Sequence, residues 1–242
     1  MMYDVEQFMR DLSEFNITLS DIQVEQFMTY YELLVEWNGF MNLTAITEYE
    51  EILKKHFEDS LSLVKVCDLT KEISLIDIGT GAGFPGIPLK IAFPNLKITL
   101  LDSLQKRIQF LNAVIEKLAL TDIDAVHGRA EDFAKPGSLR EQYDICVSRA
   151  VANLTTLSEY CIPFVKRGGV FVSYKSEKLI EEKQEAENAI SILGGCVEKQ
   201  IQFTLPDSDI CRSLFVIKKI KESPKKYPRK AGLPAKEPLK NK

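Results

Sequence analysis

The sequence predicts an α/β fold in which a mostly parallel sheet follows an N-terminal helical segment. From Ile73 onward, short apolar runs alternate with amphipathic segments, a pattern typical of parallel strands joined by helices on both faces of a sheet. A glycine-rich turn follows the first of these runs, with four glycines in the eight residues from Gly79 to Gly86. Residues 1–70 contain a single glycine and periodic apolar positions, which predict helices.

The composition excludes several classes of protein. The chain has 242 residues, of which 45% are hydrophobic and 27% are charged, and this suits one folded domain with an extension. No apolar run is long enough to cross a bilayer and the first residues lack the pattern of a signal peptide, so we expect a cytoplasmic protein without membrane contact. Five cysteines without a Cys-x-x-Cys pair predict neither a disulfide framework nor a metal site.

Positive charge is concentrated at the C-terminal end. Ten Lys or Arg residues and two Glu lie between Lys218 and Lys242, so this segment carries +8 in a chain whose net charge is −4. Four prolines after Lys221 make the segment linker-like. Such a tail can reach a polyanion, or it can be a solvated and partly disordered end, and the composition favours neither.

The N-terminal segment predicts two helices that pack against the next domain. Ser20 is a typical N-cap, and the apolar positions after it have helical spacing: Ile22, Phe27, Tyr30, Tyr31, Leu34 and Trp37. We expect Asn38–Gly39 to end this helix and a second helix to begin near Glu48. The second helix contains His56 and Asp59, and a lone histidine is more often structural than catalytic.

The stretch from Leu75 to Gly86 predicts a strand, a tight turn and the start of a helix. Glycines allow positive φ and let a ligand approach the main chain closely, and their spacing here also satisfies a dinucleotide-binding pattern. Asp77 discriminates between two cofactor classes, because a carboxylate beside the turn would repel a pyrophosphate. S-adenosylmethionine carries a cationic sulfonium and an amino group but no phosphate, so Asp77 favours this cofactor.

The end of the second strand is expected to form part of an adenosine site. Residues 97–101 form the strand, and Asp102 ends it, where a carboxylate can accept hydrogen bonds from both ribose hydroxyls. The helix over residues 103–120 is amphipathic and should turn Lys106 and Arg107 outward.

We expect the residues that follow the third and fourth strands to form the two ends of a binding site. Residues 123–127 form the third strand, and the loop after it brings the amide of Ala130 and the carboxylate of Glu131 to where an adenine edge would lie. The fourth strand covers residues 143–147. Arg149 follows it and could clamp a carboxylate or a phosphate.

The remaining segments complete a sheet of seven strands. They are predicted as a helix over 157–164, a turn over 165–169, a strand over 170–175, a helix over 177–193, and an antiparallel hairpin of strands over 196–203 and 213–217. Seven mostly parallel strands with an antiparallel last strand are the outline of a class I, Rossmann-like methyltransferase. We therefore expect a helical extension over residues 1–70, a methyltransferase domain over 71–220 and a basic tail over 221–242.

Several motifs resemble those of one bacterial family. They are Asn42-Leu43-Thr44-Ala45-Ile46, His56-Phe57-x-Asp59-Ser60, Asp77-x-Gly79-x-Gly81-Ala82-Gly83-Phe84-Pro85-Gly86-Ile87-Pro88, Asp102-Ser103-Leu104-x-Lys106-Arg107, His127-Gly128-Arg129-Ala130-Glu131, Ser148-Arg149-Ala150-Val151 and Tyr227-Pro228-Arg229-Lys230. With these motifs the chain resembles the 16S rRNA guanine-N7 methyltransferases, also called the glucose-inhibited division protein B family. The resemblance covers nearly the whole chain.

The resemblance implies a cofactor and an acceptor. The cofactor is S-adenosylmethionine, and the acceptor is N7 of one guanine in 16S rRNA, either free or in the small ribosomal subunit, with no obligatory protein partner indicated. The resemblance also implies that the cofactor pocket is lined by Gly79, Phe84, Ala130, Glu131 and Arg149. With the strand-end positions added, the expected cofactor-binding set is Asp77, Gly79, Gly81, Gly83, Phe84, Asp102, Ser103, Ala130, Glu131 and Arg149. The expected RNA-contacting set is His56, Asp59, Arg149, Lys175, Arg229 and Lys230.

Guanine N7 carries an in-plane lone pair and no proton, so methyl transfer to it needs no general base and we nominate no catalytic residue. The chain lacks the Asp-Pro-Pro-Tyr, Asn-Pro-Pro-Tyr and Pro-Cys segments that would favour an exocyclic amine or a pyrimidine ring as acceptor. The remaining alternatives are a methyltransferase for a small molecule or another RNA, an NAD-dependent oxidoreductase, and a non-catalytic RNA-binding assembly factor.

Overall fold

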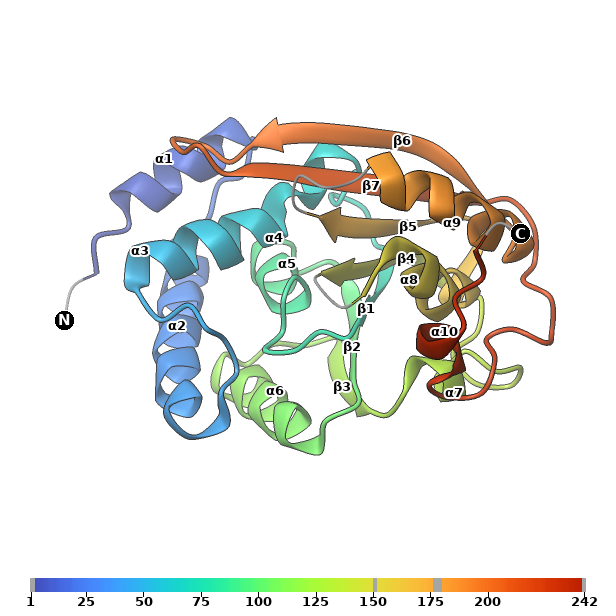
Figure 1. Ribbon diagram of the computed structural model, residues 1–242. Coiled ribbons are helices and arrows are strands. Elements are labelled where there is room, and N and C mark those ends of the chain that lie inside the picture. Colours follow the sequence, from blue (N-terminus) through green and yellow to red (C-terminus); the bar gives the residue numbers. More distant parts are fainter. Residues whose placement is uncertain (1–2, 150–151, 176–179, 241–242) are drawn as a thin grey trace.

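The computed structural model of the chain describes residues 3–149, 152–175 and 180–240, and this part forms an α/β structure in three layers (Figure 1). The middle layer is a sheet of seven strands in the order β3-β2-β1-β4-β5-β7-β6. The strands are β1 (Ser74–Ile78), β2 (Lys97–Asp102), β3 (Ile123–His127), β4 (Tyr143–Arg149), β5 (Val165–Lys175), β6 (Gly195–Thr204) and β7 (Cys211–Lys219). The first five strands are parallel, and β7 runs antiparallel to both β5 and β6. The predicted fold class is confirmed.

Helices cover both faces of this sheet. They are α1 (Glu6–Glu14), α2 (Asp21–Met41), α3 (Tyr49–Ile52), α4 (Asp59–Leu61), α5 (Gly86–Ala92), α6 (Gln105–Lys117), α7 (Ala130–Phe133), α8 (Leu154–Cys161), α9 (Ile180–Ile192) and α10 (Leu233–Lys236), with single turns η1 (Leu53–Glu58), η2 (Ser62–Lys65) and η3 (Ile162–Phe164). Helices α2, α5 and α6 lie on one side of the sheet, and α7, α8 and α9 lie on the other (Figure 1). Successive strand residues alternate between two hydrophobic cores, as Leu75 and Ile76 do, because a strand has a period of two.

The N-terminal helices share the first of these cores with the sheet. Ser20 caps α2 in a reciprocal arrangement with Gln23, which confirms the predicted N-cap. The side-chain Nε2 of Gln23 also donates to the carbonyl of Ile91, at 2.7 Å, at the end of α5. The buried hydroxyl of Tyr30 donates to the carbonyl of Ala82 in the glycine turn, at 2.5 Å. Helix α2 therefore supports the turn directly.

The predicted end of α2 at Asn38–Gly39 is wrong, because the helix continues through Gly39 to Met41. Asn42 ends it in the left-handed conformation, with φ of 51°, which asparagine tolerates better than most residues. The side chain of Asn38 instead accepts from the amides of Leu43 and Thr44, at 2.7 and 2.9 Å. Asn38 thus fixes the segment that leaves the helix.

The predicted turn over residues 165–169 is also wrong, because it lies inside β5. Val165 pairs with Tyr143, and pairing resumes with Val170 opposite Ile145, so the stretch between them is an irregularity in one continuous strand. Gly168 in this stretch has φ of 89°, which explains why its sequence has the composition of a turn.

The described part of the tail folds back onto the second face of the sheet, where α10 lies beside α7 and α8 (Figure 1). Arg140 donates to the carbonyl of Tyr227, at 2.7 Å. Arg229 forms a two-pronged ion pair with the buried carboxylate of Glu159 in α8, with Nη2 2.7 Å from Oε2 and Nε 3.0 Å from Oε1. The tail is therefore held by specific contacts as far as residue 240.

Candidate functional site

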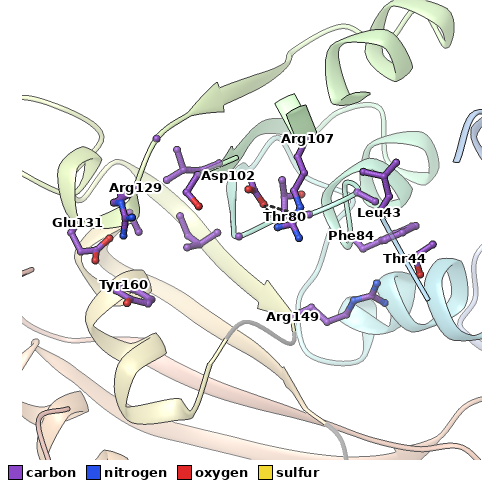
Figure 2. Close-up of a pocket in the computed structure, with 18 of the residues that line it drawn as sticks. Leu43, Thr44, Thr80, Phe84, Asp102, Arg107, Arg129, Glu131, Arg149 and Tyr160 are labelled. Atoms are coloured by element: carbon purple, nitrogen blue, oxygen red, sulfur yellow. Dashed lines mark hydrogen bonds and ion pairs between the residues drawn. The ribbon is translucent and has the colours of Figure 1, made fainter. Parts of the chain in front are cut away.

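A cavity of about 480 Å³ lies at the carboxyl ends of the parallel strands, where ligands bind in open α/β sheets. It is lined by Leu43, Thr44, His56, Ile78, Gly79, Thr80, Gly81, Ala82, Phe84, Leu101, Asp102, Ser103, Arg107, Gly128, Arg129, Ala130, Glu131, Arg149 and Tyr160. Figure 2 shows Glu131, Arg129 and Tyr160 at one end of the cavity and Arg149, Phe84 and Thr44 at the other. Asp102 lies between the two ends.

The glycine turn has the backbone conformation that its sequence predicts. Gly79, Gly81 and Gly83 have φ of 70°, 63° and 100°, which other residues rarely adopt. Gly86 is required by close packing instead, since a Cβ there would lie 2.3 Å from Cδ2 of Leu100. Gly79 and Gly81 line the cavity, whereas Gly83 lies behind it against Tyr30.

Asp77 does not occupy the position expected of it. We expected its carboxylate beside a cationic ligand, but the side chain is fully buried beneath the turn and does not line the cavity. Its Oδ2 accepts from the hydroxyl of Thr80 and the amide of Gly86, at 2.7 and 3.0 Å, and its buried Oδ1 has no partner in the described part of the chain. Burial raises the pKa of Asp77 to about 7. The carboxylate therefore holds the turn from beneath and does not line the cavity.

Asp102 lies in the cavity as predicted, but its carboxylate is already engaged. It accepts from the amides of Gly81 and Leu104, at 3.0 and 2.9 Å, and from Nη1 of Arg107, at 3.1 Å. The predicted outward direction of Arg107 is thus wrong, because the side chain folds back over the start of α6 toward the strand end. The acidic group expected to contact a ribose carries its own counter-ion.

Ala130 and Glu131 line the end of the cavity after β3, as predicted, but they begin helix α7 and do not lie in a loop. The carboxylate of Glu131 is almost fully buried, and its Oε1 accepts from the amide of Gly232 in the tail, at 2.8 Å. Arg129 and Tyr160 complete this end. The tail is therefore connected to the cavity by one hydrogen bond.

The opposite end is organised around Phe84. The ring of His56 stacks on Phe84 with 4.4 Å between ring centroids and an interplanar angle of 19°, and the guanidinium carbon of Arg149 lies 4.9 Å from the same ring. Arg149 also donates from Nη2 to Nδ1 of His56, at 3.0 Å, and from Nη1 to Oδ2 of Asp59, at 2.9 Å. Burial first, and the charge of Arg149 second, lower the pKa of His56 to about 3. A neutral imidazole and a guanidinium thus lie side by side over one aromatic ring.

The residues expected to contact RNA lie in different places. Asp59 is buried behind Arg149 and also accepts from Nε of Arg212, at 2.9 Å. Lys175 is bonded to the carbonyl of Ala152 and the carboxylate of Glu182, at 2.9 and 2.7 Å. Arg229 is bound to Glu159, as described above, while Lys230 is exposed and has no partner among the described residues. His56 and Arg149 alone of the expected set line the cavity.

Comparison with known proteins identifies the family. The family model for rRNA small subunit methyltransferase G, named GidB, matches residues 23–223. The chain belongs to this family. It is 56% identical over 238 residues to the ribosomal RNA small subunit methyltransferase G of Lachnoclostridium phytofermentans, covering 98% of each chain. It is 52% identical over 235 residues to the protein of that name from Staphylococcus aureus, covering 97% of this chain and 98% of the relative.

Solved structures show that this member of the small subunit methyltransferase G family has the methyltransferase fold. The chain superposes on M. jannaschii TYW2 in complex with AdoMet with a TM-score of 0.54 and 14% identity, covering 73% of this chain and 80% of that one. It superposes on a SAM dependent methyltransferase from Aquifex aeolicus with a TM-score of 0.51 and 16% identity, covering 69% and 92% of the two chains.

Several cavity residues of this family member were not predicted as site residues. They are Leu43, Thr44, Ile78, Thr80, Ala82, Leu101, Arg107, Gly128, Arg129 and Tyr160. Most of them lie within the motifs that carry the family resemblance, but no role in binding was predicted for them from the sequence. Tyr160 lies in the last turn of α8, where nothing in the local sequence distinguishes it from a packing residue.

Residues 3–149, 152–175 and 180–240 contain no group of three or more His, Cys, Asp or Glu side chains that could hold a metal ion. In the same part of the chain, no helix is long and apolar enough to cross a membrane.

Proposed function

We propose that this chain transfers the methyl group of S-adenosylmethionine to N7 of a guanine in the 16S rRNA of the small ribosomal subunit. The observation that carries the proposal is the elongated cavity over the glycine turn of a chain that belongs to the small subunit methyltransferase G family. Because ribosomal RNA is the proposed acceptor, the proposed place of action is the cytoplasm.

The residues at the cavity fit S-adenosylmethionine better than a dinucleotide. Two acidic side chains, Asp77 and Asp102, lie beneath and beside the turn, where a pyrophosphate would be repelled and a sulfonium attracted. The buried Oδ1 of Asp77 has no partner among the described residues, and a cationic ligand over the turn would favour its ionised form. When bound, the cofactor supplies an electrophilic methyl group on sulfur.

In this proposal, each part of the cavity holds one part of the cofactor. Ala130 and Glu131 contact the adenine, Ser103 and Asp102 the ribose, and the backbone at Gly79 and Gly81 the chain that leads to sulfur. Phe84 and Arg149 flank the methionine end, with Asp77 and Gly83 shaping the turn from behind. Arg107 must share the carboxylate of Asp102 with the ribose hydroxyls.

The acceptor base enters at the end formed by Phe84, His56 and Arg149. The hydrogen-bonded pair of His56 and Arg149 lies against Phe84 and offers a planar surface on which an exposed base can stack. Asp59 holds this surface in place through Arg149. Lys230 is exposed and is the proposed contact to the RNA backbone, because Lys175 and Arg229, the other cations expected there, are bound to Glu182 and Glu159.

No general base is needed in this mechanism, and the geometry gives His56 a different role. Its pKa of about 3 keeps it neutral, and its Nδ1 lone pair is used by Arg149, so it has no basic atom to offer the acceptor. The chain contributes by aligning N7 with the methyl carbon and sulfur, an effect worth roughly 7–11 kcal/mol in favourable cases.

The test is an acceptor-identification assay. The purified protein is incubated with methyl-labelled S-adenosylmethionine and unmodified 16S rRNA, free or in small subunits, and the RNA is digested to nucleosides. Label in 7-methylguanosine supports the proposal, and an Asp102→Asn variant should lose cofactor affinity in the same preparation. Confirmed cofactor binding without transfer to either RNA would reject the acceptor and favour a small-molecule substrate or a non-catalytic assembly role.

A further inference from the structure

The side chain of Thr44 is fixed at the acceptor end of the cavity. The segment leaving α2 is held by Asn38, whose Oδ1 accepts from the amides of Leu43 and Thr44. Thr44 lines the cavity beside Phe84 and Arg149, with its hydroxyl shown in Figure 2. The hydrogen bonds from Asn38 therefore fix the backbone at Thr44, and with it the point at which the Thr44 side chain enters the cavity.

The hydrogen-bond network assigns the direction of the bond between Thr44 and His56. Nη2 of Arg149 can only donate, so Nδ1 of His56, 3.0 Å away, must carry a lone pair. A neutral imidazole then has its proton on Nε2, and this nitrogen lies 2.8 Å from Oγ1 of Thr44. The low pKa of His56, about 3, agrees with a neutral ring. His56 is thus the donor, and the Thr44 hydroxyl is the acceptor.

The same hydroxyl accepts a second hydrogen bond, from the amide of Ile46 at 3.1 Å. A hydroxyl has two acceptor lone pairs and one proton, so both of its lone pairs are used within the protein. Its proton has no acceptor among the described residues of the chain, and the side chain lines the cavity. Thr44 is therefore a donor in the cavity and cannot turn round to accept.

We propose that the Thr44 hydroxyl donates to O6 of the target guanine and selects guanine over adenine. This inference rests on the proposed function. On the edge that carries N7, guanine presents O6 as an acceptor, whereas adenine presents its N6 amino group as a donor. A freely rotating hydroxyl would bind either base, but a hydroxyl whose lone pairs are both used meets the adenine amine donor to donor. Thr44 thus reads the base at O6, on the same edge as the N7 atom that is methylated.

Two variants and three acceptors test the inference. Thr44→Val removes the hydroxyl at nearly constant shape, and Thr44→Ser keeps it. The acceptors are 16S rRNAs assembled by ligation, with guanosine, inosine or 2-aminopurine riboside at the methylated position. Inosine keeps O6 and N7, whereas 2-aminopurine keeps N7 and lacks O6. Cofactor affinity is measured for each variant by calorimetry.

We expect the wild type to lose about 10- to 100-fold in kcat/KM on 2-aminopurine, the usual effect of leaving one buried donor unpaired, and to keep most activity on inosine. Thr44→Val should lose a similar factor on guanosine and discriminate little between guanosine and 2-aminopurine. Dividing the discrimination of the wild type by that of the variant cancels the intrinsic difference in reactivity between the two bases. Thr44→Ser should resemble the wild type.

Equal kcat/KM of the wild type on guanosine and 2-aminopurine would overturn the inference, even if Thr44→Val fails to fold. A Thr44→Val variant with weakened cofactor affinity but unchanged discrimination between the two bases would also overturn it, and would assign the hydroxyl to the cofactor carboxylate. Failure of the proposed function is distinguishable, because the wild type would then form no 7-methylguanosine on the guanosine RNA.

Discussion

At the scale of single residues, the end of the cavity around Phe84 and Arg149 depends on one buried carboxylate. Asp59 is 4% exposed and holds two arginines, with Oδ2 on Arg149 and Oδ1 on Arg212, each at 2.9 Å. Arg149 in turn fixes the ring of His56. A change at Asp59 should therefore reach the cavity although the residue does not line it.

Asp59→Asn should lower the free energy of unfolding by about 3 kcal/mol, because it leaves two largely buried guanidinium groups without their counter-ion. Urea unfolding at pH 7 measures the loss. Glu6→Gln is the matched control, since the pair of Glu6 with Arg10 is exposed and should contribute at most about 1 kcal/mol. Equal losses in both variants would contradict the role given to Asp59.

His56 makes stability depend on pH in a defined direction. Its pKa is lowered from 6.5 to about 3 in the folded state, so between these values the unfolded chain binds more protons and stability falls as pH falls. Between pH 7 and pH 5, the wild type should lose about 2 kcal/mol relative to His56→Asn. Urea unfolding of both proteins at the two pH values gives this difference. A stability difference that stays constant with pH would show that His56 titrates normally.

At the scale of elements, the glycines at helix positions differ in how much space a larger side chain would have. Gly86 begins α5 against Leu100 and Asp77, where a methyl group has no room. Gly39 lies inside α2, and a Cβ there would meet nothing within 4 Å. The first should be sensitive to substitution by alanine, and the second should gain from it.

Gly86→Ala should lower the free energy of unfolding by about 1–3 kcal/mol, because the added Cβ would lie 2.3 Å from Leu100 and 3.1 Å from Oδ2 of Asp77. Gly39→Ala should raise it by about 0.5–1 kcal/mol through helix propensity. Thermal or urea unfolding of the two variants checks both signs. Stabilisation by Gly86→Ala would mean that α5 does not begin as closely packed as described.

The strands and most helices were predictable because their patterns are local. Short apolar runs between amphipathic segments gave the seven strands, and an N-cap with helical spacing gave the start of α2. The end of α2 was missed because it depends on Asn42 in the left-handed conformation, which the Asn38–Gly39 pair imitates in sequence. Strand β5 was predicted too short because its irregular stretch has the composition of a turn.

Cavity-lining residues were predictable where they stand at a strand end or shortly after it, as Asp102 and Glu131 do. They were not predictable where a role depends on a partner far away in sequence. Arg107 turns back to Asp102, and the hydroxyl of Thr44 accepts hydrogen bonds from both His56 and Ile46. No spacing rule contains such a contact, so only the folded chain shows it.

At the scale of the whole molecule, the basic tail is anchored at two points near the cavity. Arg229 binds Glu159, which is 1% exposed, and the amide of Gly232 donates to Glu131 at the end of the cavity that follows β3. Lys230, between them, is exposed. The two neighbouring cations should therefore have separable functions, with Arg229 fixing the tail and Lys230 available to RNA.

Arg229→Ala should lower the free energy of unfolding by about 3–5 kcal/mol, because it leaves the buried carboxylate of Glu159 unpaired. The loosened tail should also weaken cofactor binding through Glu131. Lys230→Ala should leave both quantities unchanged, lower RNA affinity and reduce the salt dependence of binding by about one charge. Urea unfolding, calorimetry with the cofactor and RNA titrations at several salt concentrations separate the two variants. Similar profiles for both would contradict this division.

The most direct test of the account is the rate of a single turnover with the transferred label identified in the digested RNA. The protein is saturated with methyl-labelled S-adenosylmethionine, mixed with limiting unmodified small subunits or 16S rRNA, and sampled between pH 6.5 and pH 9. We predict label in 7-methylguanosine at a rate that does not change with pH, because N7 has no proton to lose. Label in another nucleoside, no label, or a rate that rises about tenfold per pH unit as a general base ionises would contradict the account.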